Sequence, residues 1–123
     1  ASEDNALLEA ARATGFFHET LDLKTAVGDA DFIYTDTWID MEFFFDADYQ
    51  GEKERRIKAF ESYQINSALL ESTDAYVMHC LPAHKGYEVT ADVMVSPRCI
   101  AVNQAENRMH AQKAVLLRLL GRE

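Results

Sequence analysis

The chain has 123 residues, enough for one domain with one modest hydrophobic core. Its composition, 48% hydrophobic and 27% charged, is typical of a globular domain in water, and no apolar run reaches the roughly 18 residues of a membrane span. The net charge of −9 argues against nucleic acid as a partner, because phosphate recognition needs a basic surface.

The cysteines and the first residues predict the compartment. Cys80 and Cys99 alone do not make a disulfide framework, which favours a reducing, cytoplasmic location. The acidic start of the chain lacks the basic and apolar regions of a secretory signal peptide. We therefore expect a cytoplasmic protein with no membrane partner.

The first part of the chain predicts two helices and a strand. Ser2 is a typical N-cap and Gly15 a typical helix stop, so a first helix is expected between them. Residues 16–18 are compatible with a short strand. A short helix is predicted over residues 23–29 and a buried strand over residues 31–36. This alternation predicts parallel strand pairing with right-handed crossovers.

Residues 37–49 mix aromatic and acidic side chains with no period of 2 or 3.6, which predicts a loop. The loop is long for a connection between a strand and a helix. Two interpretations are equally supported. The loop is either functional, because it follows a strand end, or a surface loop that its aromatic side chains hold against the body.

A charged helix is predicted next, over residues 50–61, and a short helix over residues 66–72 with Asn66 as its cap. The apolar run that opens residues 75–80 predicts a second buried strand, which Pro82 and the following glycine end.

The last part of the chain predicts a short helix, a strand and a long helix. The short helix spans residues 88–94 and the strand residues 99–102. Asn103 is the expected cap of the long helix, with Glu106 completing a capping box, and Gly121 ends it. The helix carries an apolar stripe that is expected to face the core: Met109, Val115, Leu116, Leu119 and Leu120.

Reactive side chains follow the predicted strands. Asp36 ends the first strand, His79 and Cys80 end the second, and Arg108 lies in the first turns of the last helix. Because the carboxyl ends of parallel strands meet at one edge of a sheet, we expect Asp36, Cys80 and Arg108 along one rim. An acid, a thiol and a guanidinium suit a polar substrate that carries an amine and an anionic or carbonyl group.

Two other chemistries are compatible with the residue types at this rim. A nucleophilic Cys80 would need His79 or His84 as its base, whereas a strand-end cysteine is more often a small buried hydrophobe. A zinc site would use His79, Cys80, His84 and Cys99. The spacing of its two histidines fits a zinc pair, but no second close pair accompanies it. We expect no metal and no cofactor.

A longer pattern points to a family. Residues 79–89, His-Cys-Leu-Pro-Ala-His-Lys-Gly-Tyr-Glu-Val, closely resemble the HCLP signature of ornithine carbamoyltransferases. The match extends through residues 34–38 and 63–66 upstream and through residues 104–114 downstream. Nearly the whole chain aligns, and the joint pattern is specific.

The resemblance implies a fold and a reaction. The fold is α/β, an open and mainly parallel sheet with flanking helices, and residues 1–123 form a Rossmann-like ornithine-binding domain truncated on its N-terminal side. In the reaction the side-chain amine of ornithine attacks carbamoyl phosphate and gives citrulline and phosphate, in arginine biosynthesis or catabolism. The implied partners are an ornithine-like amino acid, carbamoyl phosphate and further copies of the chain in a homo-oligomer.

The resemblance also implies site residues. Three are catalytic: Cys80, Arg108 and His79. Five bind substrate: Asp36, Asp40, Met41, Leu81 and Pro82. Cys80 and Leu81 would lie against the carbamoyl group and the ornithine chain, and Arg108 would polarise the carbonyl oxygen. Asp36 would hold the amino-acid end of ornithine, and the bond before Pro82 would be cis.

The chain departs from the family pattern in one loop. The family carries Ser-Met-Gly four residues after the aspartate, and this chain has Asp40, Met41 and Glu42 there. A further carboxylate suits an α-ammonium group but repels an α-carboxylate. A sister carbamoyltransferase that uses a modified ornithine or a diamine is therefore an alternative.

The second departure concerns how much of the family's two-domain pattern this sequence contains. The family's Ser-x-Arg-Thr motif for carbamoyl phosphate does not occur in this sequence, so the carbamoyl-phosphate domain is expected to be absent. The chain alone is then expected to be inactive, and a non-catalytic amino-acid-binding module is a further alternative. Missing strands would leave a sheet edge unpaired, which favours self-association.

Overall fold

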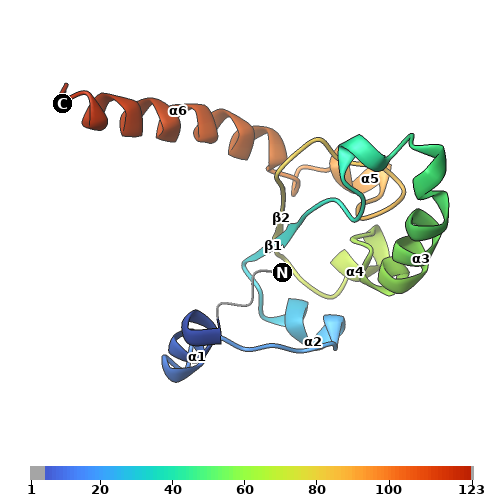
Figure 1. Cartoon of the computed structure of the whole chain (residues 1–123). Coiled ribbons are helices and arrows are strands. Elements are labelled where there is room, and N and C mark those ends of the chain that lie inside the picture. The colour runs from blue at the N-terminus through green and yellow to red at the C-terminus, as the bar shows by residue number, and fades with distance from the viewer. Residues whose placement is uncertain (1–4, 123) are drawn as a thin grey trace.

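The computed structural model describes residues 5–122 and contains a small parallel sheet with helices around it (Figure 1). The α-helices are α1 (Asn5–Ala13), α2 (Leu23–Gly28), α3 (Gln50–Phe60), α4 (Ser67–Leu70), α5 (Ala91–Met94) and α6 (Ala101–Leu119). The strands are β1 (Phe32–Thr35) and β2 (Tyr76–His79). Short 3-10 turns span Met41–Phe43, Ala47–Tyr49 and Glu61–Tyr63. The predicted cap at Ser2 lies outside the described residues.

Strands β1 and β2 pair in parallel, as the alternation of elements predicts. The register aligns Phe32 with Tyr76 at one end and Thr35 with His79 at the other. Each strand alternates between two faces. Ile33 and Val77 point into the core, whereas Phe32 and Tyr76 stack on the opposite face with ring centroids 6.1 Å apart and remain exposed. The sheet is therefore buried on one face only, and within residues 5–122 no segment pairs with the outer edge of β1.

The predicted strand over residues 99–102 is wrong. A single parallel bridge joins Cys99 to Val77, and the chain then turns directly into α6. The backbone N–H of Ile100 donates to the Val77 carbonyl at 2.9 Å, while the Ile100 carbonyl already accepts from Gln104 N at 2.9 Å. Because one residue ends the pairing and begins the helix, α6 starts before Asn103, which is not its cap.

Four other predicted elements are confirmed with small shifts in their ends: α2, α3, α4 and β2. The Asn66 side chain caps α4 by accepting from Leu69 N at 2.9 Å, as predicted. Residues 16–18 form no strand. The helix predicted over residues 88–94 begins only at Ala91, because the backbone of Ile65 pairs with Glu88 and Thr90 at 2.9 and 3.0 Å.

The hydrophobic core lies between the covered face of the sheet and the short helices. Its buried members come from α2, β1, α4, β2 and α5 and from the bridges beside them: Val27, Ile33, Ile65, Leu70, Ala75, Val77, Val89 and Val93. Val77 is fully buried and bridges Cys99 while it pairs with Ile33. The position of Val77 makes it the centre of this core.

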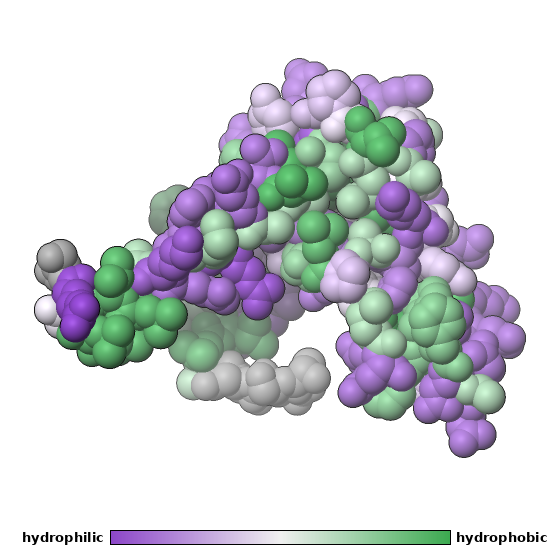
Figure 2. Space-filling view, turned by 90° about the horizontal axis from the view of Figure 1, so that it is seen from above, coloured by the Kyte–Doolittle hydropathy of each residue, from purple (hydrophilic) through white to green (hydrophobic). Residues whose placement is uncertain are grey.

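Helix α6 projects away from the body, so the prediction that its apolar stripe faces the core is wrong (Figure 1). The five stripe residues named above are between 47% and 78% exposed. Figure 2 shows hydrophobic side chains gathered at the outer end of this helix. Only the first turn packs on the sheet, where Ala101 is fully buried. None of the helices described over residues 5–122 is long and apolar enough to cross a membrane.

We expect Val77→Ala to lower the free energy of unfolding by about 2 kcal/mol, because it removes two methyl groups from the centre of the core and leaves a cavity. Urea unfolding followed by circular dichroism measures the change. Val95→Ala is the matched control, since the Val95 side chain is 79% exposed and its truncation should have little effect. Equal midpoints for the two variants would contradict this description of the core.

Candidate active site

The ends of β1 and β2 bring an acid and a thiol together. Because Thr35 is aligned with His79, the next residues on the two strands are Asp36 and Cys80. The Cys80 thiol donates to Asp36 Oδ1 at 2.8 Å, and the backbone N–H of Thr37 donates to the same oxygen at 2.7 Å. The rim expected from the sequence therefore exists for these two residues.

The electrostatics of this pair are asymmetric. The hydrogen bond from Cys80 lowers the pKa of Asp36, and the backbone N–H of Thr37 adds to the effect. Burial raises the pKa of the Cys80 thiol, and the hydrogen bond to Asp36 raises it further. At neutral pH the pair is thus a carboxylate and a protonated thiol, and the thiol is not activated as a nucleophile.

Arg108 lines the same cavity as the thiol. A cavity of about 440 Å³ lies between the sheet and the first turns of α6, and its wall includes Tyr34, Cys80, Asn107 and Arg108. A second hollow, of about 610 Å³, lies against Asp36, Trp38 and two arginines of α3. Tyr34 borders both hollows. The structure therefore brings the predicted acid, thiol and guanidinium to one region of the sheet edge.

His79 faces the interior. It is 1% exposed, and its Nε2 lies 3.1 Å from Oε1 of the fully buried Glu88. Its Nδ1 accepts from the backbone N–H of Leu81 at 2.8 Å. Since a backbone N–H can only donate, Nδ1 carries no proton and Nε2–H donates to Glu88. Nδ1 is the ring nitrogen near Cys80, at 4.0 Å, and it is already occupied, so His79 is not placed as a base for the thiol.

The turn after Cys80 has an unusual backbone. Leu81 has φ of 53°, in the left-handed region that residues with a side chain rarely adopt. The Leu81–Pro82 peptide is cis, as the family resemblance implies. Leu81 is half-buried. The two residues form the turn that carries the chain from the strand end into the loop over residues 83–88.

The long loop over residues 37–49 is held against this turn. The Thr37 hydroxyl lies 2.8 Å from His84 Nδ1, and the Phe44 ring stacks on His84 with a centroid distance of 4.0 Å. Lys53 Nζ lies 3.9 Å from the Phe44 ring centroid and donates to the Phe44 carbonyl at 3.1 Å. Of the two interpretations left open by the sequence, the structure shows the loop attached through aromatic contacts.

Asp40 and Met41 lie outside the two hollows. Asp40 Oδ2 lies 3.8 Å from Arg56 Nη1, and both Asp40 and Met41 are exposed. Neither side chain borders the cavity that holds Cys80. Substrate contact by these two residues therefore stays a prediction.

The zinc hypothesis gains no support. His79 is directed to Glu88 and His84 to Thr37, and within residues 5–122 no three His, Cys, Asp or Glu side chains gather as a metal site would require. The structure instead adds two residues that sequence reasoning missed. Tyr34 borders the cavity, and Glu88 holds His79. The one sequence signal for Glu88 is its acidic side chain between Tyr87 and Val89. The structure shows that Val89 is fully buried, as Glu88 is.

A parallel sheet with polar groups at the carboxyl ends of its strands defines an α/β domain, the class of fold in which ligand sites lie at that edge of the sheet. The comparisons with known proteins then make the assignment specific. The sequence profile described as "Aspartate/ornithine carbamoyltransferase, Asp/Orn binding domain" matches residues 2–119, and the chain belongs to that family.

Individual relatives agree with the family assignment. The ornithine carbamoyltransferase of Archaeoglobus fulgidus is 52% identical over 104 residues, which cover 83% of this chain and 32% of the relative. That of Methanosarcina mazei is 47% identical over 116 residues, covering 92% and 36%. The solved structure of ornithine carbamoyltransferase from Pyrococcus furiosus superposes with a TM-score of 0.72 at 47% identity, covering 88% of this chain and 33% of that one. The chain thus spans about a third of the length of these proteins.

We expect Asp36→Asn to lower the pKa of Cys80, because the carboxylate no longer opposes a thiolate beside it. Alkylation of Cys80 by iodoacetamide at pH 8 should become severalfold faster, since the thiolate is the reactive form. Peptide mass spectrometry measures the rate, with Cys99 of the same chain as the internal reference.

Asp31→Asn is the control variant for that measurement, because Asp31 precedes the other end of β1. Its Cys80 should react at the rate of the unmodified chain. An unchanged rate in the Asp36→Asn chain would contradict the carboxylate–thiol pairing.

Proposed function

We propose that this chain is the amino-acid-binding part of an ornithine carbamoyltransferase, which transfers the carbamoyl group of carbamoyl phosphate to the side-chain amine of ornithine. One observation carries the proposal: Cys80 and Arg108 line one cavity beside Asp36, in a chain whose family relatives are named for this reaction. The residues that hold the phosphate group are proposed to correspond to the part of the relatives that this chain does not match, about two thirds of their length.

The proposed reaction forms one bond and breaks another. The neutral amine of ornithine attacks the carbonyl carbon, a C–N bond forms, the C–O bond to phosphate breaks, and the nitrogen loses a proton. Negative charge develops on the carbonyl oxygen during the attack. Arg108 is proposed to stabilise that charge, because a guanidinium that lines the cavity can donate hydrogen bonds to a developing oxyanion.

Asp36 and Cys80 are proposed to position the amino acid. The lowered pKa of Asp36 keeps its carboxylate ionised, which attracts an ammonium group of the acceptor. The protonated Cys80 thiol is proposed to lie against the reacting groups and orient them without forming a covalent bond. Leu81 and Pro82 are proposed to shape the wall of the site through the turn that they form.

The finer assignments are proposals on the same basis. Ornithine is favoured over a modified ornithine or a diamine because the relatives from Archaeoglobus fulgidus and Methanosarcina mazei carry that name, although Asp40 and Glu42 replace the family's Ser and Gly. Arginine metabolism, a cytoplasmic location and a homo-oligomer are proposed from the family resemblance. A non-catalytic amino-acid-binding module is the second candidate.

A chimera tests the proposal directly. This chain replaces the matched third of the Archaeoglobus fulgidus enzyme, and citrulline formation is measured with carbamoyl phosphate and ornithine. N-acetylornithine and putrescine serve as alternative acceptors. Activity with ornithine supports the proposal. Activity with another acceptor but not with ornithine would indicate a sister carbamoyltransferase. Amino-acid binding without turnover would support the non-catalytic binding module instead.

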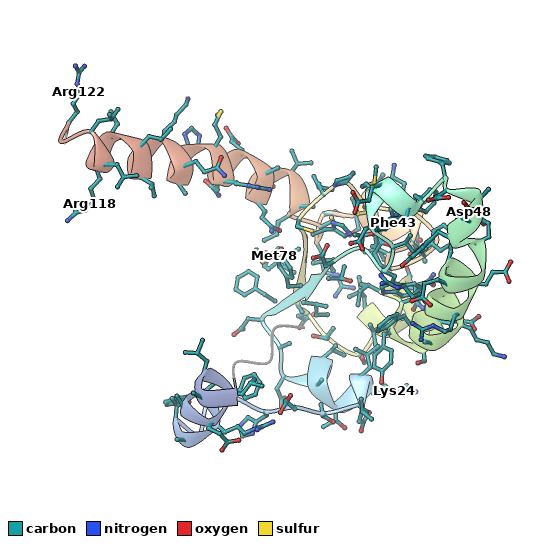
Figure 3. The ribbon with its side chains drawn as sticks, in the orientation of Figure 1. Lys24, Phe43, Asp48, Met78, Arg118 and Arg122 are labelled. Carbon is teal, nitrogen blue, oxygen red and sulfur yellow. The ribbon has the colours of Figure 1, made fainter. Side chains whose placement is uncertain are left out.

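In an active chimera we expect Arg108→Met to lower kcat by about 10²–10³-fold, the cost of removing one donor to a developing oxyanion. Arg118→Met is the matched control, because Arg118 is on the same helix at its far end from the sheet (Figure 3). The control should keep full activity. Equal losses in the two variants would contradict the role of Arg108.

A further inference from the structure

We infer that Glu88 is the positioning residue of this site: its carboxyl group, acting through His79, sets the turn that carries Cys80 and Leu81. The inference rests on the proposed function, since it gives Glu88 a part in preparing that site for carbamoyl transfer. Glu88 itself does not border the cavity that Cys80 lines.

The first step is the convergence of two donors on one oxygen. Glu88 Oε1 lies 3.1 Å from His79 Nε2 and accepts from the backbone N–H of His84 at 2.6 Å. Both side chains of the His79–Glu88 pair are fully buried. A single oxygen therefore ties the end of β2 to the loop five residues later and closes the segment that contains the turn.

The second step is the orientation of the His79 ring. Its Nδ1 accepts from Leu81 N at 2.8 Å, while its Nε2–H donates to Glu88. A half-turn of the ring would put carbon atoms in both places and break both hydrogen bonds. The other tautomer would place a proton on Nδ1, against the Leu81 N–H. Glu88 thus selects one orientation and one tautomer of the ring.

The third step is the backbone of Leu81. Its φ of 53° is disfavoured for any residue with a side chain, and such conformations persist only where the surroundings over-determine them. The hydrogen bond from Leu81 N to His79 supplies that constraint. Because Cys80 lies between these two residues, the same constraint aims its thiol at Asp36, 2.8 Å away.

The free-energy cost of burying the Glu88 carboxyl group argues against a role in packing alone. A carboxyl group that is fully buried is far less favourable than an apolar side chain of the same size unless all its polar atoms are paired. Glu88 Oε2 has no hydrogen-bond partner among the described residues. A residue selected for packing alone would be apolar here, so the acceptor oxygen of Glu88 is the feature that the turn requires.

The test uses the whole 123-residue chain labelled with ¹⁵N, and Glu88→Met and Glu88→Gln variants of it. Met keeps the shape and removes the acceptor, whereas Gln keeps an acceptor oxygen for both donors. Ring ¹⁵N–¹H correlations report the His79 tautomer, with His79→Gln identifying the signals. Iodoacetamide alkylation of Cys80 relative to Cys99 reports the position of the thiol.

Glu88→Met should lose the pure Nε2–H form of His79 and alkylate at Cys80 severalfold faster, and Glu88→Gln should restore both readouts. A Met variant with the original tautomer and rate would overturn the inference, and so would a Gln variant that behaves like Met. If Glu88→Met does not fold, Glu88→Asp replaces it. Its carboxyl group is one methylene too short to reach both donors and should give the Met result.

Turnover of the chimera separates this inference from the proposed function. In an active chimera, Glu88→Met should lower kcat by about 10²-fold, the cost of misplacing reacting groups by about 1 Å, and Glu88→Gln should recover most of it. A chimera without activity before any substitution would reject the proposed function alone. The tautomer and alkylation results would still decide whether Glu88 sets the turn.

Discussion

The parallel register of β1 and β2 is the constraint on which the rest of the structure depends. Alignment of Thr35 with His79 places Asp36 and Cys80 side by side, although 44 positions separate them in the sequence. A slip of one residue would turn the two side chains to opposite faces of the sheet. The register is maintained from the covered face, where Ile33 and Val77 are paired and buried. The small core is thus what aligns the site.

A second constraint acts after the strand ends, where the sheet no longer holds the backbone. The turn at Leu81 has a disfavoured φ, and the groups that hold it are polar and buried. An apolar contact has no directional preference, whereas a hydrogen bond to a ring nitrogen specifies both distance and orientation. Placing a thiol within 2.8 Å of a carboxylate needs that directionality. The buried pair of His79 and Glu88 is consistent with a site that gives up stability for geometry.

Features that depend on a few neighbouring residues were predicted correctly from the sequence. Features that depend on contacts between residues far apart in the sequence were not. The strand ends, the cap at Asn66 and the cis bond before Pro82 followed from patterns of a few residues or from the family motif. The strand over residues 99–102 was wrong because pairing stops after one bridge, which no property of that apolar run reveals. The stripe on α6 was wrong because periodicity identifies an apolar face but not what covers it. Glu88 was missed because its partner, His79, is nine positions away and is seen only once the turn is folded.

The acid and the guanidinium of the candidate site keep their charges separate, and the thiol contacts the acid. Among the ion pairs of residues 5–122, none joins Asp36 to Arg108, so neither charge is neutralised by the other. Asp36 instead accepts from the uncharged Cys80 thiol, which borders the cavity that Arg108 also lines. In the proposed reaction the acid has to attract an ammonium group while the guanidinium stays available for a developing oxyanion. A direct salt bridge would weaken both functions, and a thiolate at position 80 would itself attract the guanidinium. The raised pKa of Cys80 keeps the thiol neutral, so that in the proposed reaction both charges remain available to the substrates.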